Sequence, residues 1–443
     1  MSVNAEAFGK FQQAILSLDQ MAHSADLSAN EQVALVNKVF GEKLDKRMAV
    51  QLESCVHCGQ CAEACHFYVQ TQDPKYTPIR KLDLLRRFYR REQSPMRWIH
   101  RLYTRDITGE DLEQWQELVY DSCTECARCA TVCPMGINIA SMVNVTRQAY
   151  AEAGLIPGGL QVVEEEQCEQ GTVFGVGEEQ FFEAIEWLKK EGLEAPLDKP
   201  KADILLVTTV VDIMLFKDAL RSTVKILNHL GVDWTFSSHG FEAANFGLLS
   251  GLEDLQKYAS GKVIDAAIAC EAKTVIIPEC GHAYPAIRWE GANERGEPLP
   301  FKVVAIAEFM GQEVSAGRLK LKKIGTDKKV TYHDPCKIAR HGGVVEEPRQ
   351  VLNALGVDFR DMESSGVMNW CCGGGAGVFL IDRAADLRKK AFEIKIKQVN
   401  DTGADSVVLT CGSCRANFLN GREIAQWDKQ IESLVELVGD NLA

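Results

Sequence analysis

Three short cysteine-bearing stretches in the last quarter of the chain decide its fold: His333-Asp334-Pro335-Cys336, Trp370-Cys371-Cys372-Gly373-Gly374-Gly375 and Thr410-Cys411-Gly412-Ser413-Cys414. Their five cysteines follow the spacing C-x34-CC-x38-C-x2-C, and each lies where a predicted strand gives way to a Gly- or Pro-marked turn. Thiolates select zinc, copper(I) or iron–sulfur clusters. Five thiolates exceed the four ligands of a structural zinc site. Cysteines that only pack in the core are the less favoured alternative.

A second cysteine pattern occurs twice nearer the N-terminus. Cys55-x2-Cys58-x2-Cys61-x3-Cys65 and Cys123-x2-Cys126-x2-Cys129-x3-Cys133-Pro134 both have the spacing of bacterial ferredoxins, in which the fourth cysteine of each run ligates the other cluster. The spacing therefore predicts one [4Fe-4S] cluster on Cys55, Cys58, Cys61 and Cys133, and a second on Cys123, Cys126, Cys129 and Cys65. Zinc is disfavoured because the three-cysteine turn is repeated. His66 stands where proline usually follows the fourth cysteine, and 57 residues separate Cys65 from Cys123, which predicts a helical insertion.

Length and composition limit the remaining possibilities. A chain of 443 residues predicts about three domains, and a net charge of -13 argues against general nucleic-acid binding. The chain has no run of 18 apolar residues and no export signal, so we expect a cytoplasmic protein. Sixteen cysteines in such a chain predict metal binding rather than disulfides, and Cys168, inside an acidic run, is interpreted as a bystander.

The predicted insertion, residues 75–120, is basic. Residues 80–105 hold nine Lys or Arg against Asp83 and Glu92, a local charge of +7, so the rest of the chain carries -13 - 7 = -20. Thr77-Pro78 and Ser94-Pro95 predict two helix starts. Leu82, Leu85 and Phe88 form one apolar stripe, and Trp98, Ile99 and Leu102 form another. The segment suits an anionic membrane face or a partner protein; the alternative is a solvated face whose aromatic residues pack in the core.

The periodicity predicts an α+β multidomain chain. Residues 1–50 are expected to form N-terminal helices, with a capping box at Ser28 and Glu31. The ferredoxin-like domain spans 51–150, a connector 151–200, and two α/β units 201–325 and 326–443. Predicted strands at 204–207, 274–277, 330–332 and 407–409, with helices at 217–230 and 347–355, indicate parallel α/β units.

The two α/β units are internal repeats. Residues 227–233 match residues 352–358 at six of seven positions. Extended outward, this alignment sets Cys336 against Val211, Cys371 and Cys372 near Asn245 and Phe246, and Cys411 against Cys280. The first copy thus keeps one cysteine of five and cannot hold the same cluster. We expect its Glu279, Cys280 and His282 to face the cluster of the second copy across a pseudo-twofold cleft, with Cys280 as a candidate ligand; the alternative is that Cys280 only packs.

These motifs resemble a known family. The segment with five cysteines is similar to the CCG domain of heterodisulfide reductases. Most of the chain resembles the D subunit of membrane-bound heterodisulfide reductase, the DsrK component of the DsrMKJOP complex of sulfur metabolism, and the cytoplasmic iron–sulfur subunits of the Hmc and Tmc complexes. The motifs that carry the resemblance are both ferredoxin sets, the 333–336 stretch, Arg340-His341-Gly342, Glu347-Pro348-Arg349 and the 371–375 run.

The resemblance implies that Cys336, Cys371, Cys372, Cys411 and Cys414 hold a further [4Fe-4S] cluster, non-cubane or an unusual cubane, that acts on disulfides. It also implies a place in anaerobic respiration, peripheral on the inner face of the cytoplasmic membrane. The implied partners are an integral-membrane quinone- or haem-binding subunit, other iron–sulfur or cytochrome subunits, and a small disulfide-bearing protein like DsrC.

Our hypothesis for the chemistry is that electrons pass through the two cubanes to the CCG cluster, where a disulfide is reduced or formed. His333, His341 or His282 could supply protons, and Lys337 and Arg340 could stabilise a developing thiolate. Gly373 and Gly374 expose backbone N–H groups to a cluster or substrate.

Two alternatives remain open. One is a pure electron-transfer subunit, and the other is the iron–sulfur subunit of a glycolate or glycerol-3-phosphate dehydrogenase. The absence of a G-x-G-x-x-G opening a helix after a strand argues against a self-sufficient flavoenzyme.

Overall fold

The computed structural model describes residues 5–23 and 26–443. The parts of the predicted N-terminal helices at 1–4 and 24–25 lie outside the described residues. The N-terminal segment forms α1 (Ala5–Met21), α2 (Ala29–Lys43) and α3 (Lys46–Glu53). The predicted capping box opens α2: the Ser28 backbone N–H donates to Glu31 Oε2 at 2.8 Å, and the Glu31 N–H donates to Ser28 Oγ at 3.4 Å.

The two ferredoxin-type motifs fold as tight turns that lead into very short helices. The first motif contains α4 (Gln60–Glu63) and leads into α5 (His66–Thr71), and the second contains α9 (Arg128–Thr131). The residues before α4 and α9, Gly59 and Ala127, both have left-handed backbone conformations, with φ of 81° and 60°. Each turn thereby reverses the chain within the three-cysteine run.

The insertion between the motifs is helical, as predicted. Its elements are η1 (Pro74–Tyr76), η2 (Pro78–Leu82), α6 (Asp83–Phe88), the π-helical turn η3 (Tyr89–Gln93), α7 (Arg97–Tyr103), α8 (Gly109–Gln116) and the π-helical turn η4 (Glu117–Asp121). The stripe of Leu82, Leu85 and Phe88 is buried. Trp98 and Leu102 are 70% and 82% exposed, so the alternative of core packing is wrong for them. The helix predicted to start at Ser94-Pro95 is α7, which begins at Arg97, two residues after Pro95.

Three full helices follow the second motif: α10 (Ile139–Glu152), α11 (Gly158–Gln170) and α12 (Glu178–Lys190). Sequence periodicity described residues 151–200 only as a connector, but Leu160, Val163, Phe181 and Leu188 in α11 and α12 are completely buried. The segment is therefore part of the packed core rather than a linker.

Two four-stranded parallel sheets follow, with the orders β2-β1-β3-β4 and β6-β5-β7-β8. Ile204 pairs with Thr274 in the first sheet, and Val330 pairs with Ser406 in the second. Sequence patterns predicted the two central strands of each sheet and missed the outer ones. The first sheet contains β1 (Ile204–Leu206), β2 (Trp234–Thr235), β3 (Thr274–Ile277) and β4 (Lys302–Ala305); the second contains β5 (Lys329–Tyr332), β6 (Asp358–Phe359), β7 (Ser406–Leu409) and β8 (Gln430–Ser433).

Helices and short 3-10 or π turns connect these strands, as parallel pairing requires. Around the first sheet lie α13 (Val210–Met214), α14 (Lys217–Leu230), α15 (Phe246–Ser250), α16 (Glu253–Ala269), α17 (Ala283–Pro285), η5 (Ala286–Glu290), α18 (Gly291–Arg295) and α19 (Ile306–Ser315). Around the second lie α20 (Cys336–Ala339), α21 (Glu346–Leu355), η6 (Gly366–Met368), η7 (Val378–Leu380), η8 (Asp382–Ala384), α22 (Ala385–Thr402), α23 (Gly412–Ala425) and α24 (Leu434–Asp440).

Each α/β unit places its last helix against the other unit. Helix α19 of the first unit packs on α21 of the second, and α24 of the second packs on α14 of the first. A Cβ on Gly311 in α19 would lie 2.3 Å from Glu347 Cβ, and a Cβ on Gly439 in α24 would lie 2.5 Å from Ser222 Cβ. Both contacts need glycine because the helix surfaces approach too closely for a side chain. The two units are joined by matching contacts on both sides.

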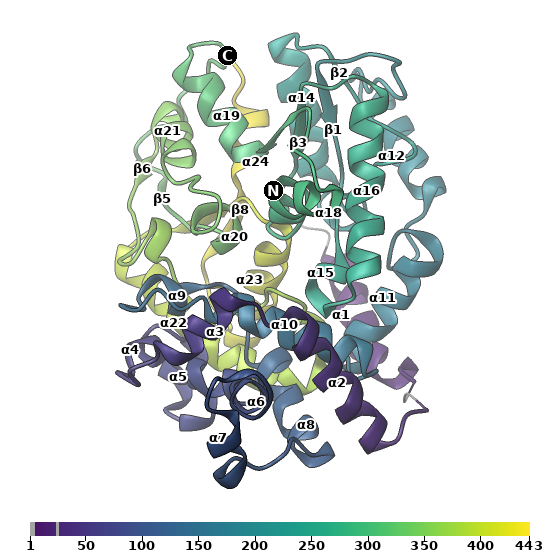
Figure 1. Cartoon of the computed structure of the whole chain (residues 1–443). Coiled ribbons are helices and arrows are strands. Elements are labelled where there is room, and N and C mark those ends of the chain that lie inside the picture. Colours follow the sequence, from purple (N-terminus) through teal and green to yellow (C-terminus); the bar gives the residue numbers. More distant parts are fainter. Residues whose placement is uncertain (1–4, 24–25) are drawn as a thin grey trace.

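Figure 1 shows the arrangement of the parts. The two α/β units stand side by side in the upper half, and the ferredoxin-type motifs and the basic insertion lie below them, with α7 near the lower end. The main hydrophobic cluster runs from Phe8 in α1 to Val438 in α24, and a second cluster packs around the first sheet. Among the described helices, none has both the length and the apolar content required to cross a bilayer.

Candidate metal centre

The five cysteines of the C-terminal unit meet at one point. Cys336 opens α20, Cys371 and Cys372 lie in the loop after η6, Cys411 follows β7, and Cys414 is in the first turn of α23. All five are buried. Their thiols are neighbours in the order Cys336, Cys371, Cys372, Cys414, Cys411. Interactions between these neighbouring thiols raise the pKa of Cys371 and Cys414 and lower that of Cys372 and Cys411.

A buried salt bridge orients the loops that carry these thiols. Asp334 accepts two bonds from Arg349, at 2.9 and 3.0 Å, and a third from the Gly366 N–H at 2.7 Å. Asn417 on α23 donates to the Cys372 carbonyl at 2.7 Å. The backbone of Gly373 has a φ of 97°, which a side chain would strain. The predicted glycine is therefore needed for the turn that follows Cys372.

His333 lies beside the thiols with both ring nitrogens buried and unpartnered. One of its nitrogens, Cys372 Sγ and Cys414 Sγ all lie within 4.8 Å of one another. Burial, and then the nearby Lys395 ammonium, lower the pKa of His333. A buried polar group without a partner is costly, so this corner of the structure fits a group that the protein chain itself does not supply.

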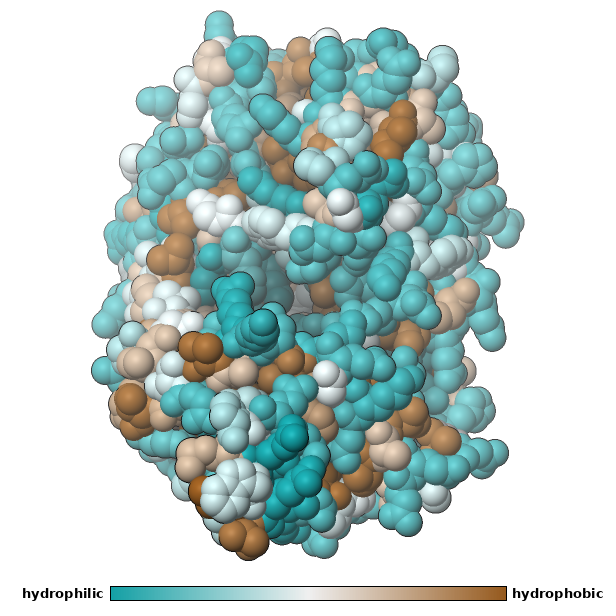
Figure 2. Space-filling view, in the orientation of Figure 1, coloured by the Kyte–Doolittle hydropathy of each residue, from teal (hydrophilic) through white to brown (hydrophobic). Residues whose placement is uncertain are grey.

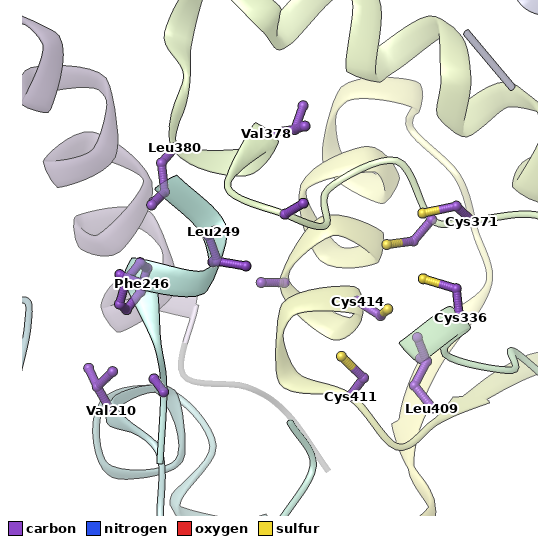
Figure 3. Packing of buried hydrophobic residues seen from close by; sticks show 14 of the residues in the cluster. Val210, Phe246, Leu249, Cys336, Cys371, Val378, Leu380, Leu409, Cys411 and Cys414 are labelled. Atoms are coloured by element: carbon purple, nitrogen blue, oxygen red, sulfur yellow. The ribbon is translucent and has the colours of Figure 1, made fainter. Parts of the chain in front are cut away.

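The first α/β unit forms the opposite wall of a cavity of about 100 Å³. Figure 3 shows Val210, Phe246 and Leu249 of that unit on one side and the labelled cysteines on the other. Cys280 and His282 also line this cavity, so the structure brings them to the five thiols. A Cβ on the intervening Gly281 would lie 3.1 Å from Cys411 Sγ.

Glu279, Cys280 and His282 of the first unit were expected to face the cluster. The structure places Cys280 and His282 at the cavity, and burial shifts the pKa of all three groups. Burial lowers the pKa of His282 to about 4, helped by Lys337, and leaves the imidazole neutral at pH 7. Burial also raises the pKa of the Cys280 thiol. The Glu279 carboxylate points away from the cavity and accepts a bond from Ser433 Oγ at 2.8 Å. Its burial raises its pKa to about 8.

The remaining predicted residues lie on α20 and just after it. Lys337 lines both the thiol cavity and a groove of about 580 Å³, and His341 lines the groove. Figure 2 shows a hollow in this part of the surface. Burial and Lys337 lower the pKa of His341 to about 3. Arg340 donates to the carbonyls of Cys126, Val367 and Asn369, a geometry that favours a positioning role.

The ferredoxin-type cysteines gather in two sets. Cys55, Cys58, Cys61 and Cys133 line one cavity of about 120 Å³. Cys65, Cys123, Cys126 and Cys129 line a second cavity of about 30 Å³. Each fourth cysteine thus lies with the other run, as the crossed pairing of the two motifs requires.

The second ferredoxin-type set touches the C-terminal set. The Cys371 thiol lies next to the Cys126 sulfur, and this interaction lowers the pKa of Cys126. Arg340 joins the two loops through the Cys126 and Asn369 carbonyls. Arg128 stacks 3.5 Å above the Trp370 ring and donates to the Met368 carbonyl at 3.0 Å. The second ferredoxin-type set therefore adjoins the last set, and Ile139 lines the cavities of both ferredoxin-type sets.

Three buried cations near these sets were not predicted from the sequence. Arg147 on α10 is completely buried and donates to the carbonyls of Cys123, Leu249 and Ala376 at 2.6–2.8 Å. Lys81, counted as part of the basic run, is buried and donates to the Ser122 carbonyl. Lys395 is buried beside the five thiols, and burial lowers its pKa to about 8. Each of these three residues has apolar neighbours at helical spacing in the sequence, and this pattern could have predicted that its side chain is buried.

The donor sets suit iron–sulfur clusters. They are buried, soft and too numerous for tetrahedral zinc alone. Residues 51–137 match the family described as "4Fe-4S dicluster domain", and residues 330–419 match the "Cysteine-rich domain" called CCG. The chain therefore has a domain for two 4Fe-4S clusters and a further cysteine-rich domain suited to an iron–sulfur cluster.

The chain is homologous to the D subunit of heterodisulfide reductase. It is 28% identical over 399 residues to the D subunit of the dihydromethanophenazine:CoB–CoM heterodisulfide reductase of Methanosarcina acetivorans, covering 89% of this chain and 94% of the relative. It is 27% identical to "Hdr-like menaquinol oxidoreductase iron-sulfur subunit 2" of Archaeoglobus fulgidus, covering 90% and 82%. It is 26% identical to "EtfAB:quinone oxidoreductase" of Syntrophomonas wolfei, covering 85% and 56%.

Proposed function

We propose that this chain is the iron–sulfur subunit of a membrane-bound redox complex and that its C-terminal thiol cavity reduces or forms a disulfide. The observation that carries the proposal is the contact between the second ferredoxin-type motif and the last unit, where Arg340 donates to the carbonyls of Cys126 and Asn369 and the thiols of Cys126 and Cys371 are neighbours. Such a junction suits electron transfer into a centre that performs chemistry. The names of the relatives, which include menaquinol and quinone oxidoreductases, support a partner in the membrane.

The chain's own residues prepare the cavity for one cluster and its substrate. Cys336, Cys371, Cys372, Cys411 and Cys414 are the proposed ligands, and the first α/β unit is a degenerate CCG repeat whose apolar wall excludes water. When bound, the clusters supply one-electron transfer between a donor and the disulfide. Lys337 lies between the thiol cavity and the outer groove, where its ammonium attracts a thiolate formed on cleavage.

The reaction in the reducing direction is RSSR′ + 2 e⁻ + 2 H⁺ → RSH + R′SH, in which the S–S bond breaks and each sulfur gains one electron and one proton. The test uses anaerobically prepared holoprotein with reduced methyl viologen as a one-electron donor. Oxidation of two viologens per disulfide cleaved is the expected result. Three four-iron clusters predict about twelve irons per chain.

The Cys372→Ala variant should lose the EPR signal of the third cluster and the disulfide turnover while both ferredoxin-type signals remain. Cys168→Ala is the matched control, because Cys168 is exposed and lies outside all three sets. An unchanged spectrum in Cys372→Ala would defeat the ligand assignment. Three intact clusters with no turnover of any disulfide would instead favour the alternative of a pure electron-transfer subunit.

A further inference from the structure

One exposed apolar cluster stands out on the surface. Of the large hydrophobic side chains that are exposed among the described residues, the three most exposed are Leu102 at 82%, Trp98 at 70% and Tyr103 at 66%. All three belong to α7, and Met96, at 52%, immediately precedes it. We call these four residues the α7 tip. Clustered exposure of this kind marks an interaction site, whereas single exposed apolar residues do not.

Arginines surround the α7 tip. Arg97 and Arg101 are exposed on the same helix, and Arg105 follows it. Arg97 makes no ion pair within the described part of the chain, while Arg101 pairs with Glu92 at 2.5 Å. Residues 90–105 contain five arginines and one glutamate, a net charge of +4. Arg91 pairs with Asp106 and Arg105 pairs with Asp111, so Arg90 and Arg97 are the arginines of this segment that form no ion pair among the residues that the structure describes.

The helix is held rigidly to the element beneath it. His100 Nδ1 bonds with the Arg90 carbonyl at 3.1 Å, and Arg101 Nε donates to the Arg91 carbonyl at 3.0 Å. These bonds use the inner face of α7 and leave Trp98 and Leu102, one helical turn apart, on the outer face. In Figure 2, brown and pale side chains lie beside teal ones at the lower end of the molecule, where Figure 1 places α7.

The shape and chemistry favour a lipid surface over a protein partner. The α7 tip is a convex end of the molecule rather than a groove. Its Trp and Tyr are the residues that reside at the headgroup level of bilayers, and aliphatic side chains beside exposed arginines are typical of helices that lie in the interface plane. An anionic bilayer attracts the basic end and repels the acidic remainder of the chain, which fixes one orientation.

In that orientation the insertion that carries α7 faces the bilayer. Residues of the same insertion line both ferredoxin-type cavities: Thr77 and Ile79 line the first, and Pro78 and Lys81 line the second.

We propose that α7 is a membrane-contact helix that inserts Trp98, Leu102 and Tyr103 into the headgroup region of an anionic bilayer. This contact is separate from the disulfide chemistry. It would strengthen membrane binding beyond the affinity that a membrane-embedded partner provides.

The test is co-sedimentation of anaerobic holoprotein with vesicles of phosphatidylcholine, with and without phosphatidylglycerol. Binding is expected only to the anionic vesicles and should weaken as salt rises. The Trp98→Ser/Leu102→Ser double variant should bind about tenfold more weakly because its apolar anchors are gone. Arg97→Gln should bind about fivefold more weakly, the factor that corresponds to about 1 kcal/mol per basic residue.

Two matched controls separate local from general effects. Phe182→Ser removes an exposed aromatic residue from α12, and Lys201→Gln removes an exposed cation near the first sheet; both should bind as the parent protein does. Cluster signals must be unchanged in every variant, which shows that folding is intact. The proposal is overturned if the parent protein does not bind anionic vesicles. It is also overturned if the α7 variants bind vesicles as the parent does and lose only their binding to a membrane-protein partner.

Discussion

Replacing Arg147 with methionine should destabilise the junction of all three parts of the protein. The guanidinium is completely buried and donates to the carbonyls of Val119 at 2.9 Å, Leu249 at 2.6 Å, Ala376 at 2.8 Å and Cys123 at 2.8 Å. Those carbonyls belong to three parts of the protein: the ferredoxin-like domain (Val119 and Cys123), the first α/β unit (Leu249) and the second α/β unit (Ala376). Methionine fills much of the volume but leaves the carbonyls without donors.

The expected loss is about 3–5 kcal/mol, the cost of breaking a buried ionic site by removing one member. Glu125, whose carboxylate lies 3.7 Å from the guanidinium, would be left as a buried charge without its cation. The gross value of four charge-assisted bonds is larger, but the desolvation of the guanidinium offsets part of it. For 443 residues, an unfolding entropy of about 2.1 cal/mol/K per residue gives about 0.9 kcal/mol/K, so a loss of about 4 kcal/mol lowers Tm by about 4 °C if the chain unfolds as one unit.

The assay is anaerobic thermal unfolding followed by circular dichroism, together with the iron content of the folded protein. Arg360→Met is the control, because Arg360 forms an exposed ion pair with Asp358 and its loss should cost at most about 0.5 kcal/mol. Arg147→Lys keeps the charge but cannot reach all four carbonyls, and should fall between the two. An Arg147→Met variant with the parent's Tm and iron content would refute the argument that this side chain joins the three parts.

Three further outcomes follow from the structure. The Cys133→Ser variant should lose the same EPR signal as Cys58→Ser, whereas Cys65→Ser should keep that signal, because the fourth cysteines are crossed. Lys81→Met should lower the midpoint potential of the second ferredoxin-type cluster in an EPR redox titration, because the buried ammonium that favours the reduced state is gone. Burial raises the pKa of Glu242 from 4.5 to about 8, so Glu242→Gln should flatten the fall in Tm that the parent shows as pH rises from about 5 to 8.

The sign of the last effect follows from proton linkage. The folded protein holds the Glu242 proton more tightly than the unfolded chain does, so this group favours folding most below pH 4.5. The advantage declines by about 1.4 kcal/mol per pH unit until the pH passes the folded pKa. A glutamine variant that is as pH-sensitive as the parent would contradict this reasoning, as would an unshifted potential in Lys81→Met.

The sequence predicted those parts of the fold that depend on local pattern. Strand β3 (Thr274–Ile277) and helix α14 (Lys217–Leu230) were predicted with their observed bounds, because each is a short apolar run or a strongly amphipathic helix. The outer strands β2 and β6 have two residues each, too few for any periodic signal. Helix α11 was not predicted because Gly154, Pro157, Gly158 and Gly159 were interpreted as breaking the chain, whereas Pro157 directly precedes the helix and Gly158 and Gly159 begin it.

For the candidate site as well, the features with a local sequence pattern were predicted and those that depend on tertiary contacts were not. Spacing was enough to group the cysteines, because ligand geometry is recorded in short sequence intervals. The functions of single polar residues were not predictable in this way. Arg340 was expected at a thiolate, yet its donors are taken by backbone carbonyls. His282 and His341 were expected to titrate near neutrality, yet burial lowers both pKa values to about 4 and about 3. Burial depends on tertiary contacts that no local pattern records.

The glycine contacts at Gly311 and Gly439 explain why the cysteine-poor half of the repeat persists. Because each half ends in a helix that lies on its neighbour, removing either half would strip a helix from the other and expose its apolar face to water. The first α/β unit, which has lost four of the five cysteines, is therefore needed to cover apolar helix surfaces of the second unit, which has kept all five. Residues 326–443 expressed alone should yield aggregates rather than a miniature enzyme.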